Sequence, residues 1–217
     1  MPASNLTSER QRLSRFDIVG SYAENAIRFV RHVGLFNSDI QMVKANDDVS
    51  AVHMQPPLID KPMKAHVVGR VPLTNEDVQE IAAWIKGTTD EYERSKATDK
   101  RRQYIIDPPW QDVRDPNTGV RRYRRYSCAG FVLDSHLQVN IELLQLDSQA
   151  LPEVDRETIT SAYFGSGRHP RSLAMFGLQG DGPWRIVLPG YVLHALNRPS
   201  DQIRKQPYRA QRGNERF

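Results

Sequence analysis

The stretch Tyr126-Ser127-Cys128-Ala129-Gly130-Phe131-Val132 turns a basic, aromatic run into an amphipathic helical pattern, and it contains the only cysteine of the chain. The first backbone N–H groups of a helix lack internal partners and carry a partial positive charge. A cysteine at that place ionises more easily and becomes a nucleophile near neutral pH. The alternative is a structural residue, because free cysteines are often buried as small apolar groups. Cys128 is therefore the candidate nucleophile.

The Cys128 helix is predicted to continue through Leu146, and Pro152 prevents any extension beyond it. Its apolar face is formed by Val132, Val139, Ile141, Leu143 and Leu144. His136 lies eight residues after Cys128, which is roughly 12 Å along a helix axis. That separation is too long for a proton transfer between the two side chains.

The remainder of the chain predicts an α+β order of elements. Alternation of apolar residues predicts strands at 17–20, 32–36, 40–45 and 66–71, with 32–36 and 40–45 forming a hairpin. Helical spacing predicts a short helix at 23–30 and a longer one from Thr74, which begins like a capping box, to about Lys86, before Gly87. Residues 87–120 are polar and rich in turn signals, so they predict a long surface excursion.

Several of these segments together resemble one known family. Phe16-Asp17-Ile18-Val19-Gly20 is followed by Arg31-His32-Val33-Gly34-Leu35-Phe36, by Gln41-Met42-Val43-Lys44-Ala45, and much later by the cysteine helix. This order resembles the circularly permuted branch of the NlpC/P60 papain-like hydrolases, in which the cysteine helix comes last. The further matching segments are 68–72, 78–85 and 198–201. The resemblance implies a permuted papain-like fold, with an antiparallel sheet packed against a cysteine-bearing helix.

The same resemblance implies a site composed of Cys128 and His32, with His32 as the base that takes the thiol proton. In the family, a polar residue about twelve positions after the base accepts a hydrogen bond from the imidazole. Lys44 holds that position here and has no acceptor. Period-two alternation puts Asn46 on the same face, so Asn46 is expected to orient His32. A Cys–His dyad and a site that has lost catalysis are the two alternatives.

The leading hypothesis is a thiol-dependent hydrolase or acyltransferase that acts on an amide or ester bond of a peptide-like or acyl substrate. Cys128 attacks the carbonyl, and its backbone N–H helps to hold the oxyanion. The competing hypothesis is a catalytically inactive papain-like binding or assembly protein. A metal-dependent hydrolase is the weakest reading, because no closely spaced ligand set such as H-E-x-x-H is present. We therefore expect neither a cofactor nor a metal site.

The composition is that of a single soluble domain. The 217 residues suffice for a proper core, and no apolar run is long enough to cross a bilayer. A single cysteine excludes a disulfide framework and a multi-thiolate zinc site. Met1 to Arg15 has no apolar core of a secretory signal, so we expect a cytoplasmic protein.

The positive charge is concentrated near the C-terminus. Residues 198–217 carry six basic and two acidic side chains, which account for the net charge of +4. We expect residues 1–13 to be a flexible N-terminus, 14–201 the NlpC/P60-type domain with an elaboration within 135–190, and 202–217 a basic tail that is poorly ordered unless docked. A second cluster interleaves tyrosines with Arg121, Arg122, Arg124 and Arg125. In the binding hypothesis, this cluster and the tail contact a polyanion or an acidic partner.

Overall fold

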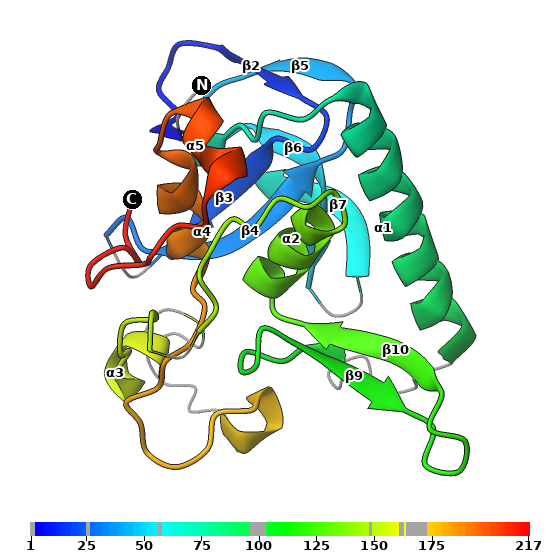
Figure 1. The fold of residues 1–217 in the computed structure, drawn as a ribbon. Helices are drawn as coiled ribbons and strands as arrows, with labels where there is room; N and C mark the ends of the chain where they lie inside the picture. Colours follow the sequence, from blue (N-terminus) through cyan, green and yellow to red (C-terminus); the bar gives the residue numbers. More distant parts are fainter. Residues whose placement is uncertain are drawn as a thin grey trace.

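The computed structural model describes residues 3–24, 27–55, 58–95, 103–147, 149–160, 163 and 173–217, and these form an α+β structure. Its largest sheet has six antiparallel strands in the order β1-β8-β3-β4-β6-β7 (Figure 1). The strands are β1 (Ser4–Asn5), β3 (Ile18–Tyr22), β4 (Val30–Phe36), β6 (Asp48–Met54), β7 (Leu58–Lys64) and β8 (Val67–Gly69).

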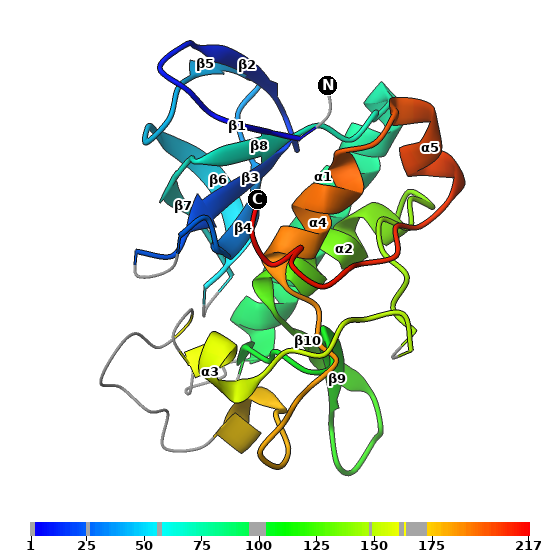
Figure 2. The ribbon, with the colours of Figure 1, turned by 90° about the vertical axis from the view of Figure 1, so that its left-hand side faces the viewer.

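Helices cover one face of this sheet, and a two-stranded ribbon covers the other. Helices α2 (Cys128–Leu137) and α4 (Pro189–Leu196) contact the strands directly, while α1 (Asn75–Ser95) packs on α2 (Figure 2). The ribbon pairs β2 (Gln11–Ser14) with β5 (Ile40–Val43). The sheet is therefore apolar on both faces, and each face has its own core.

Strand β4 shows how the two faces divide. Val33 and Leu35 belong to the large core beneath the helices, whereas Phe36 belongs to the smaller core beneath the ribbon. A Cβ added at Gly34 would lie 2.8 Å from the Cβ of His53, which places that histidine on the face of Gly34 and Phe36. Alternation along the strand assigns His32 to this same face.

The predicted strands around Asp17 and His32 are confirmed as β3 and β4. The helix predicted at 23–30 is wrong for the part of that segment that the structure describes, which forms turns and the beginning of β4. Phe29 pairs with Arg216, and Val30 donates its N–H to the Glu215 carbonyl. Pairing with a distant segment therefore overrides the short helical pattern. Asn25 and Ala26 lie outside the described residues.

The predicted hairpin of 32–36 with 40–45 is also wrong. Strand β5 leaves the sheet and pairs with β2, so the neighbours of β4 are β3 and β6. Val43 is buried in the small core, and Ile40 and Met42 point outward. The chain between β4 and β6 thus covers one face of the sheet. Alternation of apolar residues predicts a strand there but does not indicate which strand it pairs with.

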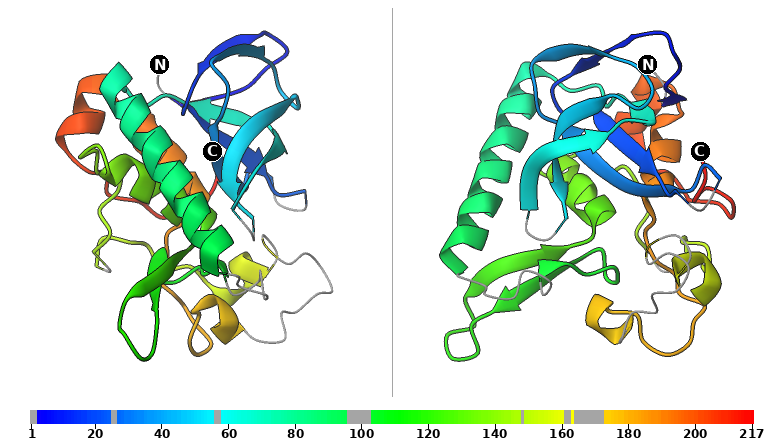
Figure 3. Two further views of the ribbon diagram at one scale, coloured as in Figure 1. Left: turned by 90° about the vertical axis from the view of Figure 1, so that its right-hand side faces the viewer. Right: turned by 180° about the vertical axis from the view of Figure 1, so that it is seen from behind.

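Helix α1 begins at the predicted capping box, in which Thr74 and Asp77 exchange hydrogen bonds of 2.8 and 3.2 Å. It does not stop at Gly87 but continues to Ser95, because Thr88 and Tyr92 extend its buried face beyond Ile81. The excursion expected at 87–120 therefore begins as helix. Its later part is strand β9 (Trp110–Arg114), which pairs with β10 (Arg121–Tyr126) and lies at the end of α1 (Figure 3).

Helix α2 is shorter than predicted. It ends at Leu137, and the N–H groups of Val139 and Ile141 both return to the His136 carbonyl. Asn140 has a φ of 58°, which no helix continues through. Ile141, Leu143 and Leu144 fill the core from a stretch that is neither helix nor strand, which buries the same apolar side chains without a helical turn.

Both termini pack against the domain in their described parts. Residues 3–13, expected to be flexible, supply β1 and β2. After α5 (Ser200–Lys205), the tail forms a parallel bridge between Tyr208 and Leu144 and buries Ala210. The other short helices are α3 (Arg156–Ile159) and the 3-10 turn Leu173–Phe176. Within the described ranges, no helix is both long and apolar enough to cross a membrane.

One close approach fixes the beginning of α2. A Cβ at Gly130 would overlap the Pro109 carbonyl, and this carbonyl accepts a hydrogen bond of 3.0 Å from the Ser127 N–H. Gly130→Ala should therefore lower the free energy of unfolding by about 2 kcal/mol or more. Gly87→Ala, with open space around it in α1, should raise it by about 0.5 kcal/mol. Urea titrations of both variants measure the two effects, and equal behaviour would contradict the close approach.

Candidate active site

Cys128 is the first residue of α2, at the helix N-terminus that the sequence predicted. Ser127 is the N-cap: its φ of −78° and ψ of 166° are extended, and its hydroxyl accepts a 2.8 Å hydrogen bond from the Gly130 N–H. As the first helical residue, Cys128 has a backbone N–H without an intrahelical partner. Its side chain is only 1% exposed.

The Cys128 thiol is held in its neutral form. Burial raises its pKa, and four groups partly oppose this: the Val33 backbone, the Tyr104 hydroxyl, the Ala129 backbone and the backbone of Cys128 itself. The Tyr104 hydroxyl donates to Sγ at 3.9 Å. The expectation of an easily ionised thiol is therefore wrong for this buried arrangement, because desolvation outweighs the helix N-terminus.

His32 lies on β4 and makes its hydrogen bond with another histidine. Its Nε2 is 2.7 Å from Nδ1 of His53 on β6, and the two rings meet edge to face at 82°. Burial, then the charges of His53 and Arg31, lower the pKa of His32 to about 3. Burial also lowers the pKa of His53, although the Lys61 backbone and Asp60 oppose this. Both imidazoles are neutral at neutral pH.

Asn46, expected to orient His32, does not reach it. It is exposed in the turn between β5 and β6, with a φ of 68°, and its backbone N–H bonds to the Ala65 carbonyl. His53 is at the opposite end of β6, at least about 15 Å away along an extended strand. Lys44 is also exposed. The imidazole partner is therefore His53, and Asn46 has no part in the hydrogen bonding of His32.

Sequence reasoning missed His53 because it took β5 for the neighbour of β4. The true neighbour is β6, in which Leu35 and Phe36 pair with Val52 and Ala51. Alternation along β6 places Val49, Ala51 and His53 on one face, which is the face that Gly34 shares. The sequence therefore does show that His53 shares a face with the buried residues of its strand. Recognising it as the partner of His32 required the correct strand order.

The thiol and the imidazole of His32 lie on opposite faces of β4, because Cys128 packs from α2 on the side of Val33 and His32 is on the side of Gly34. The backbone N–H of Val33, the residue directly after His32, acts on the Cys128 thiol. Cys128 makes no hydrogen bond with either histidine in the part of the chain that the structure describes. The sulfur thus lies against the backbone of β4 on the helix side of the sheet. The two histidines meet on the other side of that strand.

A cavity of about 690 Å³ opens beside the two histidines. Tyr104, which contacts the thiol, lines it together with His32 and His53. The other lining side chains are largely apolar or aromatic, with charged groups at Glu24, Arg31 and Lys64. A ligand in this cavity would meet the imidazoles directly and would reach the sulfur only past the Tyr104 side chain. No signal in the sequence identified Tyr104.

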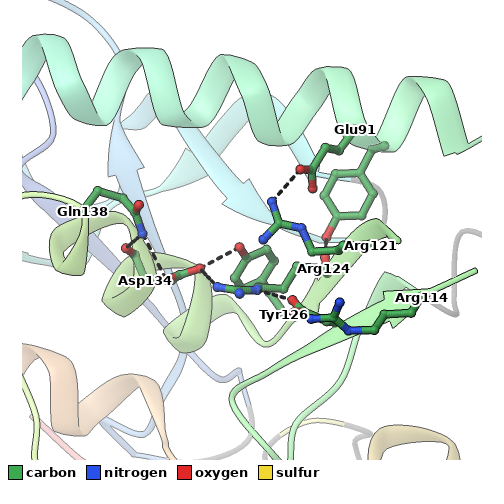
Figure 4. Close-up of polar contacts among 9 residues, drawn as sticks. Glu91, Arg114, Arg121, Arg124, Tyr126, Asp134 and Gln138 are labelled. Carbon is green, nitrogen blue, oxygen red and sulfur yellow. Dashed lines mark hydrogen bonds and ion pairs between the residues drawn. The ribbon is translucent and has the colours of Figure 1, made fainter. Parts of the chain in front are cut away.

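The arginine run of β10 is committed to internal contacts. Arg121 pairs with Glu91 at 2.6 Å, Arg122 with Asp115, and Arg125 donates to the carbonyls of Tyr104 and Met175. Arg124 bridges Asp112 at 2.7 Å and the buried Asp134 of α2 at 2.8 Å. Figure 4 shows Asp134 meeting Arg124, Tyr126 and Gln138 at once. The run therefore fastens the β9–β10 hairpin to α1 and α2.

Within the described residues, no three His, Cys, Asp or Glu side chains gather closely enough to hold a metal ion. A scan against protein-family models, a search of curated proteins and a search of solved structures each found no match to this chain. The interpretation of the site therefore depends on its own geometry.

Arg124 and Arg122 give a matched pair of substitutions. Arg124→Gln would leave the carboxylate of Asp134, which is 3% exposed, without its counter-charge, and we expect a loss of about 3 kcal/mol in the free energy of unfolding. Arg122→Gln removes an exposed ion pair and should change stability little. Urea unfolding of both variants measures the difference. A loss of similar size in both would show that the buried contact with Asp134 stabilises the fold no more than an exposed ion pair does.

Proposed function

We propose that this chain is a thiol-dependent hydrolase or acyltransferase of permuted papain-like architecture, with Cys128 as nucleophile and His32 and His53 as its imidazole pair. The observation that carries the proposal is the 2.7 Å contact between His32 Nε2 and His53 Nδ1. This contact uses one nitrogen of His32 and leaves Nδ1 for a proton donor. The α2 N-terminus delivers the thiol to the next residue of the same strand.

The proposed chemistry follows from the protonation states. The thiol and the His32 imidazole lie on opposite faces of β4, so the proposed reaction requires substrate binding to bring the two groups together. With Nε2–H of His32 donating to His53 Nδ1, the Nδ1 atom of His32 then accepts the thiol proton as sulfur attacks the carbonyl carbon. The Cys128 N–H, which has no intrahelical partner, donates to the oxyanion. The tetrahedral intermediate then expels the amine or alcohol, which takes the proton from His32. Water or an acceptor alcohol attacks the resulting thioester by the reverse route and restores the thiol.

The pKa shifts assign a resting state to this pair. His32, with a pKa of about 3, stays neutral but is a weak base toward a thiol whose pKa is raised, so proton transfer requires that substrate binding change the surroundings of both groups. The resting pair is thus a thiol and a neutral imidazole, and charge separation begins when substrate binds. The substrate must displace the Tyr104 side chain to reach the sulfur. The aromatic and apolar cavity wall favours an apolar acyl group.

The activity test uses nitrophenyl esters of short and long fatty acids and a matched set of variants. Cys128→Ala should abolish the enzyme-dependent release of nitrophenol, and His32→Ala should lower kcat/KM by about a hundredfold or more. His53→Gln should lower it by about tenfold, because His32 loses its orienting acceptor. Asn46→Ala is the control and should leave the rate unchanged. The wild-type rate should not fall as pH decreases through 6.5, the ordinary pKa of histidine.

A second candidate function is a papain-like binding protein without catalysis. The observation that favours it is the sealed thiol, which is 1% exposed and has a raised pKa. This candidate predicts that no ester is turned over, and that Cys128→Ala binds apolar acyl ligands as wild type does. The same assay set separates the two functions, since a rate lost in Cys128→Ala excludes the binding protein.

A further inference from the structure

A second cavity, of about 530 Å³, lies where the docked tail meets the loop before α3. The tail contributes Arg209, Ala210 and Arg212, and the loop contributes residues 149–153 and Asp155. Pro183 and Arg185 complete the lining. The cavity shares no lining residue with the one beside His32, so it is a separate feature of the fold.

The backbone that carries the two tail arginines is firmly held. Tyr208 exchanges hydrogen bonds of 2.9 Å with Leu143 and Gln145. The Asn214 side-chain oxygen accepts from both the Tyr208 hydroxyl and the Gln211 N–H, each at 2.8 Å. Ala210, between the arginines, is 6% exposed. Arg209 and Arg212 therefore leave a fixed turn at the rim of the cavity, although their side chains are exposed.

Some of the charged side chains around the cavity already have hydrogen-bond or ion-pair partners, and others do not. Arg185 donates to the Leu151 carbonyl at 2.9 Å and pairs with Glu153 at 3.0 Å. The Asp155 carboxylate caps α3 by accepting a 2.6 Å hydrogen bond from the Thr158 N–H. Arg209 and Arg212 make no hydrogen bond or ion pair with any described residue. Hydrogen bonds with Thr158 lower the pKa of the Asp155 carboxyl, and the charge of Arg212 adds a smaller effect in the same direction. Two guanidinium groups thus face the cavity without a committed acceptor.

We propose that this cavity binds a phosphate group, with Arg209 and Arg212 as its two ligands. A guanidinium is a planar fork that matches the oxygens of phosphate and carboxylate. A carboxylate balances one guanidinium, whereas a phosphate dianion balances two and can accept from both. Two other charged residues restrict where the phosphate can bind. Arg185 is already paired with Glu153, and the negative charge of Asp155 disfavours an anion near α3. This site acts independently of Cys128 and of the proposed hydrolase chemistry.

The test is isothermal titration calorimetry of the full chain at constant ionic strength, with inorganic phosphate and adenosine monophosphate as separate probes. Wild type should bind phosphate, and Arg209→Gln/Arg212→Gln should weaken it by about tenfold or more. The control Arg10→Gln/Arg216→Gln removes two exposed positive charges outside the cavity and should leave the affinity unchanged. Tighter binding of the nucleotide would assign the phosphate to an organic ligand, and equal binding would assign it to free phosphate.

Three results would overturn the proposal. The first is wild-type protein that binds neither probe. The second is an equal loss of affinity in the two double variants, which would show a general effect of net charge rather than a site. The third is binding detected only with a single-stranded oligonucleotide, which would indicate a diffuse polyanion surface. Circular dichroism of each variant confirms that the fold is retained.

Discussion

The close approach of Gly130 to the Pro109 carbonyl is the constraint on which the site depends. It seats the first turn of α2 against the chain before β9, where the Ser127 N–H bonds the same carbonyl and the Ser127 hydroxyl caps the helix. One turn further on, Asp134 ties the helix to β10 through Arg124 and Tyr126. These contacts fix both the depth and the direction of α2, so Cys128 reaches the backbone of β4 rather than solvent.

Burial and hydrogen bonding then decide the protonation of the candidate site. The helix N-terminus favours a thiolate, but complete enclosure of Cys128 favours the thiol, and the second effect is larger. The same enclosure holds His32 neutral, and the contact with His53 fixes which of its nitrogens is free. A neutral thiol and a neutral imidazole next to an apolar cavity form a site that is inert until a ligand rearranges it. Tyr104, between the cavity and the sulfur, is the side chain that must move.

Local patterns predicted local structure, and they failed where distant segments compete. Alternation at 32–36, the Thr74–Asp77 capping box and the helix N-terminus at Cys128 each depend on neighbours within one turn or strand, and all three are confirmed. The partner of β5 depends on β2, and the end of α2 depends on how Ile141 to Leu144 fill the core. His53 was missed for the same reason: its role follows from strand order, which periodicity does not contain. The tail was expected to be poorly ordered unless docked, and the structure docks it through Tyr208 and Ala210, which the count of its charges did not indicate.

His32, held by His53, is the proposed base of Cys128. The most direct measurement is the rate of Cys128 alkylation by iodoacetamide as a function of pH, in wild type and in His32→Ala, with Asn46→Ala as control. We expect wild type and the control to react at neutral pH at least about tenfold faster than His32→Ala, because the imidazole provides a base for a thiol whose raised pKa otherwise keeps it protonated. Identical pH profiles in wild type and His32→Ala would contradict it, since the imidazole would then have no influence on the sulfur.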